Sequence, residues 1–140
     1  MIPKALPAPR IVDPNSVPRL RWGVIGPGEI AKTFVDSTHK HTAQQVTAVA
    51  SRTPGKAEAF AQPRGIAKAF TSYEQLVTDP DIDVVYVATT HEFHLDHALL
   101  AIQAGKHVLV EKPIAITAEQ AQRIADAAKA ANVLAKLENI

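Results

Sequence analysis

The sequence has no cysteine among its 140 residues, which excludes a disulfide-stabilised fold and thiolate chemistry. It also lacks an excess of charge of either sign, because 15 Lys and Arg are balanced by 14 Asp and Glu for a formal net charge of +1. A strongly basic chain would be attracted to nucleic acid or to an anionic membrane. We therefore expect neither partner here.

Long apolar runs are missing as well, since no stretch approaches the roughly 18 residues of a membrane-spanning helix. The first ten residues contain no apolar segment of the kind that a secretory signal requires. Hydrophobic residues nevertheless make up 46% of the chain, which is enough for one core. These features predict a soluble, cytoplasmic protein that does not contact membranes.

Half of the ten prolines lie near the N-terminus, at Pro3, Pro7, Pro9, Pro14 and Pro18. Proline fixes φ and has no backbone N–H, so this segment cannot form a regular helix or a central strand. We expect an extended, proline-rich arm over residues 1–20 and a folded domain over residues 21–140. The arm is interpreted either as a tail without fixed structure or as an arm that wraps a neighbouring subunit.

Short apolar segments alternate with amphipathic segments from residue 21 onward. Strands are expected at residues 21–25, 46–50, 67–70, 83–88, 107–110 and 133–135. A helix is expected after each of the first five strands; the first covers residues 29–38, with Ile30, Phe34 and Val35 on its buried face. This alternation predicts an α/β fold with a doubly wound parallel sheet of about six strands, the Rossmann fold.

Several residues indicate where these helices begin and end. Ser72 and Thr117 each open a capping box, and the pair Thr53-Pro54 is also typical of a helix start. Gly105 and Asn132 suit the left-handed position that follows a helix.

The turn between the first strand and the first helix contains Gly26, Gly28 and Ala31 in the spacing G-x-G-x-x-A. In dinucleotide sites the first small residue permits a tight turn, the second lets the backbone approach a pyrophosphate, and the third lets the helix pack on the strand. The helix N-terminus then offers N–H groups to phosphates. We expect Gly26, Gly28, Glu29 and Ile30 to bind the cofactor. The alternative is a glycine turn that serves packing alone.

The end of the second strand indicates which nicotinamide cofactor is bound. NAD sites usually carry Asp or Glu there, to bind the ribose 2′-hydroxyl, but this chain has Ser51 and Arg52. A guanidinium can pair with a 2′-phosphate, a serine hydroxyl can donate to it, and Lys56 adds a second positive charge. We therefore expect NADP, with NAD as the less favoured cofactor. Alternatively, Arg52 is a solvated surface charge.

Lys112 follows the strand at residues 107–110, between Glu111 and Pro113. In doubly wound sheets ligands bind at the carboxyl ends of the strands. A lysine at that edge can exchange a proton with a substrate oxygen. The alternative is an ordinary surface lysine.

Four segments together resemble the Gfo/Idh/MocA family of oxidoreductases. They are residues 21–31, the pair Ser51-Arg52, residues 89–94 (TTHEFH) and residues 104–113 (AGKHVLVEKP), and the last run is the most specific. The resemblance extends from about residue 21 to residue 134. It implies an NAD- or NADP-binding domain and hydride transfer at a carbon that bears a hydroxyl, on a sugar, a polyol, a diol or a related small molecule.

The resemblance also assigns roles to individual residues. It implies that Lys112 lies beside the nicotinamide and transfers the proton, and that Glu111 helps to place the cofactor. It further implies that Thr90, His91 and His94 belong to a loop that lies along the cofactor. His94 is thus expected to be a neutral cofactor-loop residue, and its spacing from the neighbouring histidines is not interpreted as a metal site.

Members of this family carry a second, larger α/β domain that supplies most of the substrate pocket. No segment of the present sequence matches it. Two hypotheses follow: the nucleotide-binding part of an NADP-dependent oxidoreductase, cut before its substrate domain, or a stand-alone module that binds a nucleotide or a partner without turnover. In either case we expect an incomplete active site, some exposed apolar surface at the carboxyl edge of the sheet, and possible self-association.

Overall fold

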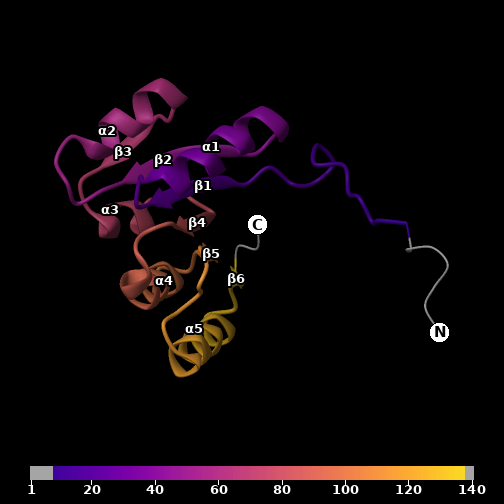
Figure 1. The fold of residues 1–140 in the computed structure, drawn as a ribbon, viewed down its shortest axis with the longest axis vertical. Coiled ribbons are helices and arrows are strands. Elements are labelled where there is room, and N and C mark those ends of the chain that lie inside the picture. The colour runs from indigo at the N-terminus through magenta and orange to yellow at the C-terminus, as the bar shows by residue number, and fades with distance from the viewer. Residues whose placement is uncertain (1–7, 138–140) are drawn as a thin grey trace.

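Six parallel strands form one sheet in the computed structural model, which describes residues 8–137 (Figure 1). The strand order is β3-β2-β1-β4-β5-β6, and every neighbouring pair is parallel. This confirms the predicted Rossmann-type α/β fold. The strands are β1 (Arg21–Ile25), β2 (Gln45–Ala50), β3 (Lys68–Phe70), β4 (Val84–Val87), β5 (His107–Val110) and β6 (Ala135–Leu137).

Helices cover both faces of the sheet, because each strand sends alternate side chains into two separate cores. Val24 and Tyr86 pack in one core, under α1 and α2, whereas Ile25 and Val85 pack in the other, under α3, α4 and α5. Burial on both faces explains why the central strand β4 is apolar along its whole length. The helices are α1 (Glu29–His41), α2 (Lys56–Ala61), α3 (Tyr73–Thr78), α4 (His94–Gln103) and α5 (Ala118–Ala130), with short 3₁₀ turns η1 (Gln62–Arg64) and η2 (His91–Phe93).

Most of the predicted helix ends are confirmed. The Ser72 hydroxyl accepts from the Gln75 N–H and begins α3, and the Thr117 hydroxyl accepts from the Gln120 N–H and begins α5. Asn132 has a φ of 54°, the left-handed conformation expected after α5.

Three local predictions were wrong. The helix α2 begins at Lys56 rather than Pro54, because the Thr53 N–H donates to the Ser51 hydroxyl and holds Thr53 in a turn instead of a cap. The strand β6 covers Ala135–Leu137 instead of 133–135, since the chain is still leaving α5 at Val133. Ile30 is 37% exposed and does not join the buried face of α1, where Ala31 packs instead.

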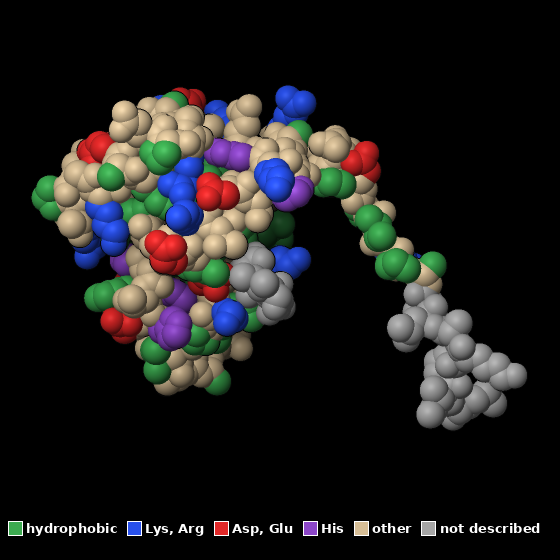
Figure 2. Space-filling view, turned by 45° about the horizontal axis from the view of Figure 1, so that its top comes forward, with side chains coloured by type: hydrophobic (Ala, Val, Ile, Leu, Met, Phe, Trp, Pro, Cys, Tyr) green, Lys and Arg blue, Asp and Glu red, His purple; other side chains and the backbone are tan. Residues whose placement is uncertain are grey.

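The N-terminal segment of residues 8–20 contains no helix or strand and extends away from the sheet (Figures 1 and 2). Ile11 and Val12 are exposed along it. Its last residues are held by Gln44, which accepts from the Leu20 N–H and donates to the Pro18 carbonyl. The predicted division at residue 20 stays a prediction, and residues 1–7 and 138–140 lie outside the described range. Between residues 8 and 137, no helix is long and apolar enough to cross a membrane.

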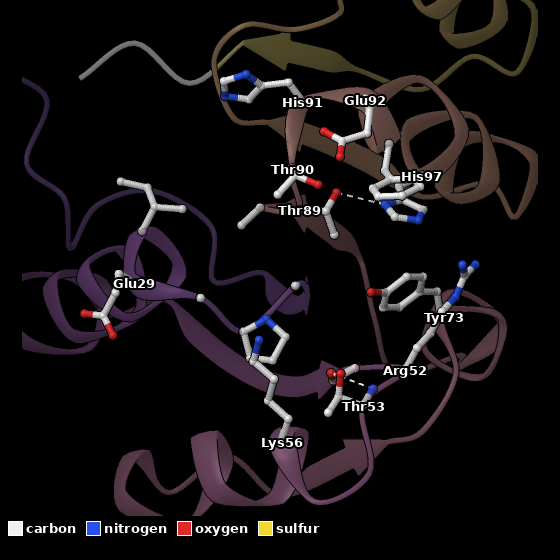
Figure 3. Close-up of a pocket in the computed structure, with 17 residues that line it drawn as sticks. Glu29, Arg52, Thr53, Lys56, Tyr73, Thr89, Thr90, His91, Glu92 and His97 are labelled. Atoms are coloured by element: carbon white, nitrogen blue, oxygen red, sulfur yellow. Dashed lines mark hydrogen bonds between the residues drawn. The ribbon is translucent and has the colours of Figure 1, made fainter.

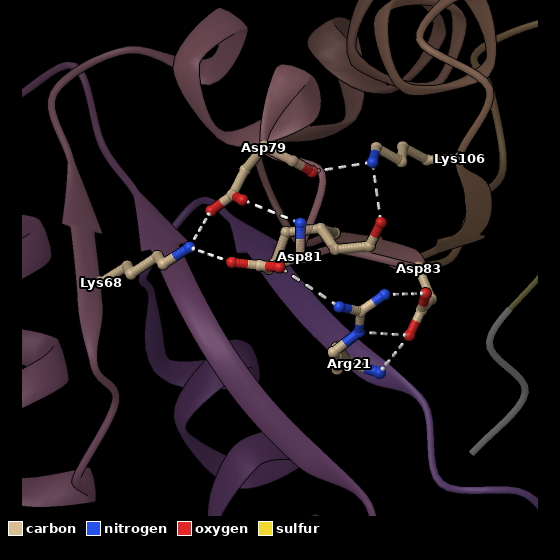
Figure 4. A network of polar contacts seen from close by, with 7 residues as sticks. Arg21, Lys68, Asp79, Asp81, Asp83 and Lys106 are labelled. Atoms are coloured by element: carbon tan, nitrogen blue, oxygen red, sulfur yellow. Dashed lines mark hydrogen bonds and ion pairs between the residues drawn. The ribbon is translucent and has the colours of Figure 1, made fainter.

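A network of charged groups joins the amino ends of the strands (Figure 4). Arg21 donates to both carboxylate oxygens of Asp83, at 2.8 and 3.0 Å. Lys68 donates to Asp79 at 2.7 Å and to Asp81 at 3.0 Å. These three aspartates therefore tie β1, β3 and the segment before β4 together.

Lys106 completes this amino-edge network from the segment before β5. Its ammonium donates to the Asp79 carbonyl at 2.8 Å and to the Ile82 carbonyl at 2.7 Å (Figure 4). These two bonds fix the turn that precedes β4 from the side opposite to Lys68.

Acid is expected to weaken the amino-edge network. Hydrogen bonds from Arg21 lower the pKa of Asp83 from 3.8 to about 2. Because the Asp83 pKa is lower in the folded than in the unfolded state, the ionised carboxylate stabilises the fold at pH values above its unfolded-state pKa. This stabilisation is lost as the pH falls through its folded-state pKa. We expect the free energy of unfolding, measured by urea titration at each pH, to fall between about pH 4 and pH 2. The fall should be shallower in Asp83→Asn, which lacks the titrating carboxyl group. Asp126→Asn, on the exposed face of α5, should retain the wild-type slope.

Candidate functional site

A cleft of about 760 Å³ lies at the carboxyl edge of the sheet (Figure 3). Its walls come from the turn after β1 (residues 26–30), the segment after β2 (residues 51–53, with Lys56) and the loop after β4 (residues 88–93). The strand order reverses between the neighbouring strands β1 and β4, and ligands of doubly wound sheets bind at this switch point. The volume lies within the range of small-molecule sites.

The turn after β1 requires glycine at one position and leaves open space at another. Gly26 has a φ of 90°, and a Cβ there would lie 2.9 Å from the Thr89 nitrogen and 3.0 Å from the Ala88 carbonyl carbon. A Cβ on Gly28 would meet nothing within 4 Å. The N-cap residue of α1 is Gly28, which has no side chain to accept from the first N–H groups of the helix. The arrangement suits an anionic pyrophosphate.

The segment after β2 brings two cations to the cleft. Lys56 extends from the start of α2, and the Arg52 guanidinium lies over the Tyr73 ring, with 4.7 Å from its central carbon to the ring centroid (Figure 3). Ser51 is buried at the base, where its hydroxyl accepts from the Thr53 N–H at 3.2 Å. The three residues predicted here therefore line one wall together.

The opposite wall follows β4 and includes a buried histidine. The Thr89 hydroxyl is hydrogen-bonded to Nδ1 of His97 at 2.9 Å, and the His97 ring packs edge-on against Tyr73 and stacks on Phe93. Burial lowers the pKa of His97 to about 4, so this imidazole is neutral at pH 7. Thr90 and His91, both predicted as cofactor-loop residues, line the same wall.

His94, by contrast, lies behind this wall. It is fully buried, and its ring nitrogens lie 2.7 Å from the Pro113 carbonyl oxygen and 2.9 Å from the Thr89 carbonyl oxygen. The side chain therefore joins the loop after β4 to the turn after β5. Across residues 8–137, no group of three or more histidines and carboxylates is arranged to hold a metal ion.

Glu111 and Lys112 also lie outside the lining of the cleft. Glu111 is buried, and its carboxylate accepts from the Tyr86 hydroxyl and from the Lys112 N–H, each at 3.0 Å. It borders a smaller hollow beside α1. The Lys112 side chain is exposed at the carboxyl edge, and nothing in the described part of the chain encloses it. The cofactor and catalytic roles of both residues stay predictions.

Several residues of the cleft were not predicted from the sequence, among them Thr53, Tyr73, Thr89, Phe93 and His97. One signal could have found Tyr73. It begins the helix that follows β3, and the carboxyl end of β3 lies at the same edge as those of β1 and β2. His97 lies one turn into α4, where its spacing fits an ordinary core position.

Exposed apolar side chains occur at this edge, as predicted. Ile30, Phe93 and Ile116 follow β1, β4 and β5, and they are 37%, 44% and 58% exposed. Self-association through them stays a prediction.

A family model described as "Oxidoreductase family, NAD-binding Rossmann fold" (Gfo/Idh/MocA) matches residues 20–138. The chain belongs to this family. Together with the cleft, this makes it a Gfo/Idh/MocA nicotinamide-dinucleotide-binding domain. The match covers both the glycine turn and the Glu111-Lys112-Pro113 segment.

Individual relatives agree with this membership. The chain is 46% identical over 114 residues to a 1,5-anhydro-D-fructose reductase from Ensifer adhaerens, covering 81% of this chain and 34% of that protein. It is 44% identical over 115 residues to a trans-1,2-dihydrobenzene-1,2-diol dehydrogenase from Xenopus tropicalis, covering 81% and 35%. A 3-ketoreductase from Actinomadura kijaniata, solved with NADP, superposes with a TM-score of 0.82 and 32% identity, covering 86% and 37%. The chain thus spans about a third of the length of the curated relatives it matches.

Proposed function

We propose that this Gfo/Idh/MocA domain binds NADP(H) in preference to NAD(H). The observation that carries the proposal is the wall after β2, where Arg52, Lys56 and the buried Ser51 lie together. The carboxylates of the cleft, Glu29 and Glu92, belong to the segments after β1 and β4 instead. A 2′-phosphate at the end of β2 would therefore lie beside the cations Arg52 and Lys56, and the residues of this wall include no carboxylate that would repel it.

Binding titrations test this preference. We expect tighter NADPH than NADH binding when nicotinamide fluorescence is followed, and Arg52→Ala should weaken NADPH binding by about 1–3 kcal/mol, or roughly 5- to 150-fold in Kd. NADH should be affected much less, because it has no 2′-phosphate. Arg123→Ala, on the exposed face of α5, is the matched control. Equal wild-type affinities for the two cofactors, or unchanged NADPH affinity in Arg52→Ala, would contradict the proposal.

We further propose that the domain serves hydride transfer between the nicotinamide and a small hydroxyl-bearing molecule, such as a sugar, polyol or diol. Two relatives, a 1,5-anhydro-D-fructose reductase and a trans-1,2-dihydrobenzene-1,2-diol dehydrogenase, support this class of substrate by their names. Lys112 is proposed as the residue that exchanges a proton with the substrate oxygen, since it follows β5 at the carboxyl edge.

A binding module without turnover is the second candidate function. It is favoured by the exposure of Lys112, because hydride transfer needs a substrate held at close range with water excluded. The two functions differ in whether an added substrate domain restores turnover that depends on Lys112.

A further inference from the structure

Four side chains, Arg52, Tyr73, His97 and Thr89, form a continuous row from the segment after β2 to the loop after β4 and the start of α4 (Figure 3). The Arg52 guanidinium lies 4.7 Å from the Tyr73 ring centroid. The centroids of the Tyr73 and His97 rings lie 4.6 Å apart, in an edge-to-face arrangement. Nδ1 of His97 is in turn hydrogen-bonded to the Thr89 hydroxyl at 2.9 Å. Tyr73 is therefore the link between the cationic wall and the wall after β4.

Tyr73 is the fixed member of its contact with Arg52. It is 8% exposed and is the first residue of α3, whose start is held by the Ser72 cap. The Arg52 side chain, in contrast, is exposed and comes from an irregular segment. A long flexible side chain loses rotamer freedom when it binds a ligand. A ring that already holds this side chain in the free protein lowers the entropy that is lost on binding. Tyr73 thus limits the orientations that Arg52 adopts before ligand binding.

The charge around the Tyr73 ring also favours this arrangement. The other partner of the ring, His97, is neutral at pH 7 because burial lowers its pKa to about 4. The guanidinium therefore lies on a ring whose aromatic neighbour in the row is uncharged, and no second cation of the row contacts that ring. A cation over an aromatic face is attracted by the negative potential of that face.

We propose that Tyr73 is a specificity-determining positioning residue, whose ring holds the Arg52 guanidinium where a 2′-phosphate binds and so sets the preference for NADPH over NADH. This inference rests on the proposed NADP function. It assigns to α3, a helix outside the glycine turn and outside the segment after β2, a part in cofactor discrimination. Tyr73 acts through Arg52 and needs no contact with the phosphate itself.

The test is the ratio of the Kd for NADH to the Kd for NADPH in the 140-residue chain. Tyr73→Leu should lower this ratio by about 2- to 5-fold, the fold-change of one cation–π contact at an exposed site. Tyr73→Phe keeps the ring and should retain the wild-type ratio. In an Arg52→Ala background, Tyr73→Leu should leave the ratio unchanged, because the group that it positions is gone. Thermal unfolding checks that each variant is folded, and Tyr73→Met is the second variant if Tyr73→Leu does not fold.

The outcomes separate the two proposals. If Tyr73→Leu weakens NADPH and NADH binding equally, the residue only supports the cleft, and the inference is overturned. If Arg52→Ala lowers the ratio but Tyr73→Leu and Tyr73→Met do not, the inference fails while the NADP proposal stands. If Arg52→Ala itself leaves the ratio unchanged, the NADP proposal fails first.

Discussion

Replacing Gly26 by alanine is expected to lower the free energy of unfolding by about 2–5 kcal/mol, which is the sum of a left-handed backbone strain and an overpacked contact. The strain follows from the φ of 90°, and the contact follows from the 2.9 Å that would separate the new Cβ from the Thr89 nitrogen. In thermal unfolding the midpoint should fall by roughly 10 °C. NADPH binding should fall with it, because the turn can no longer lie against the loop after β4.

Gly28→Ala is the matched control for this prediction. A Cβ at Gly28 meets no atom within 4 Å, and its φ of −101° is open to alanine. The midpoint should therefore change little, since alanine at a helix N-cap costs about 1 kcal/mol or less relative to glycine. NADPH binding should nevertheless be lost, because the methyl group occupies the space that the pyrophosphate needs. Wild-type affinity in Gly28→Ala would show that the cofactor does not approach the backbone there.

Removal of the Lys112 ammonium is expected to produce the largest effect on turnover. For this measurement, residues 21–137 of the chain would replace the corresponding segment of the Ensifer adhaerens 1,5-anhydro-D-fructose reductase. In that fusion Lys112→Ala should lower kcat by about 10²- to 10⁴-fold, the usual contribution of a general acid or base. The NADPH affinity should stay close to that of the parent fusion, because Lys112 does not line the cofactor cleft.

Lys129→Ala, on the exposed face of α5, controls for loss of a positive charge. Turnover that survives Lys112→Ala undiminished would remove Lys112 from the proton-transfer role. Turnover absent from the parent fusion, with NADPH binding intact, would favour a domain that binds the cofactor without supporting hydride transfer.

The sheet and the glycine turn could be predicted because their signals are local. A strand buried on both faces, such as β4, must be apolar along its length, and the φ of 90° at Gly26 favours a residue without a Cβ. The capping residues Ser72 and Thr117 are equally local, since each satisfies an N–H three residues away. Thr53 failed as a cap because Ser51, two residues earlier, competes for its backbone.

The rest of the site depends on contacts between distant segments. Tyr73 reaches Arg52 only because β3 and β2 end at the same edge, and the sequence spacing between them carries no trace of that contact. His94 matched a cofactor loop by its position in the motif. It is buried because the turn after β5 folds back on α4 and places the Pro113 carbonyl beside the ring. The hydrophobic periodicity of the sequence does not indicate this contact.

The amino-edge network and the cleft lie at opposite ends of the same strands. Strands of four to six residues, such as β1, β2 and β4, separate the two by roughly 13–20 Å at 3.3 Å per residue. Mutational effects usually add when sites are more than about 7–10 Å apart and share no partners. If the proposed roles of Arg52 and Tyr73 hold, we expect substitutions there to change cofactor preference, and substitutions at Arg21 and Asp83 to change stability, with additive effects. The length of the strands thus keeps the two groups of residues apart, so that cofactor binding and stability can change independently.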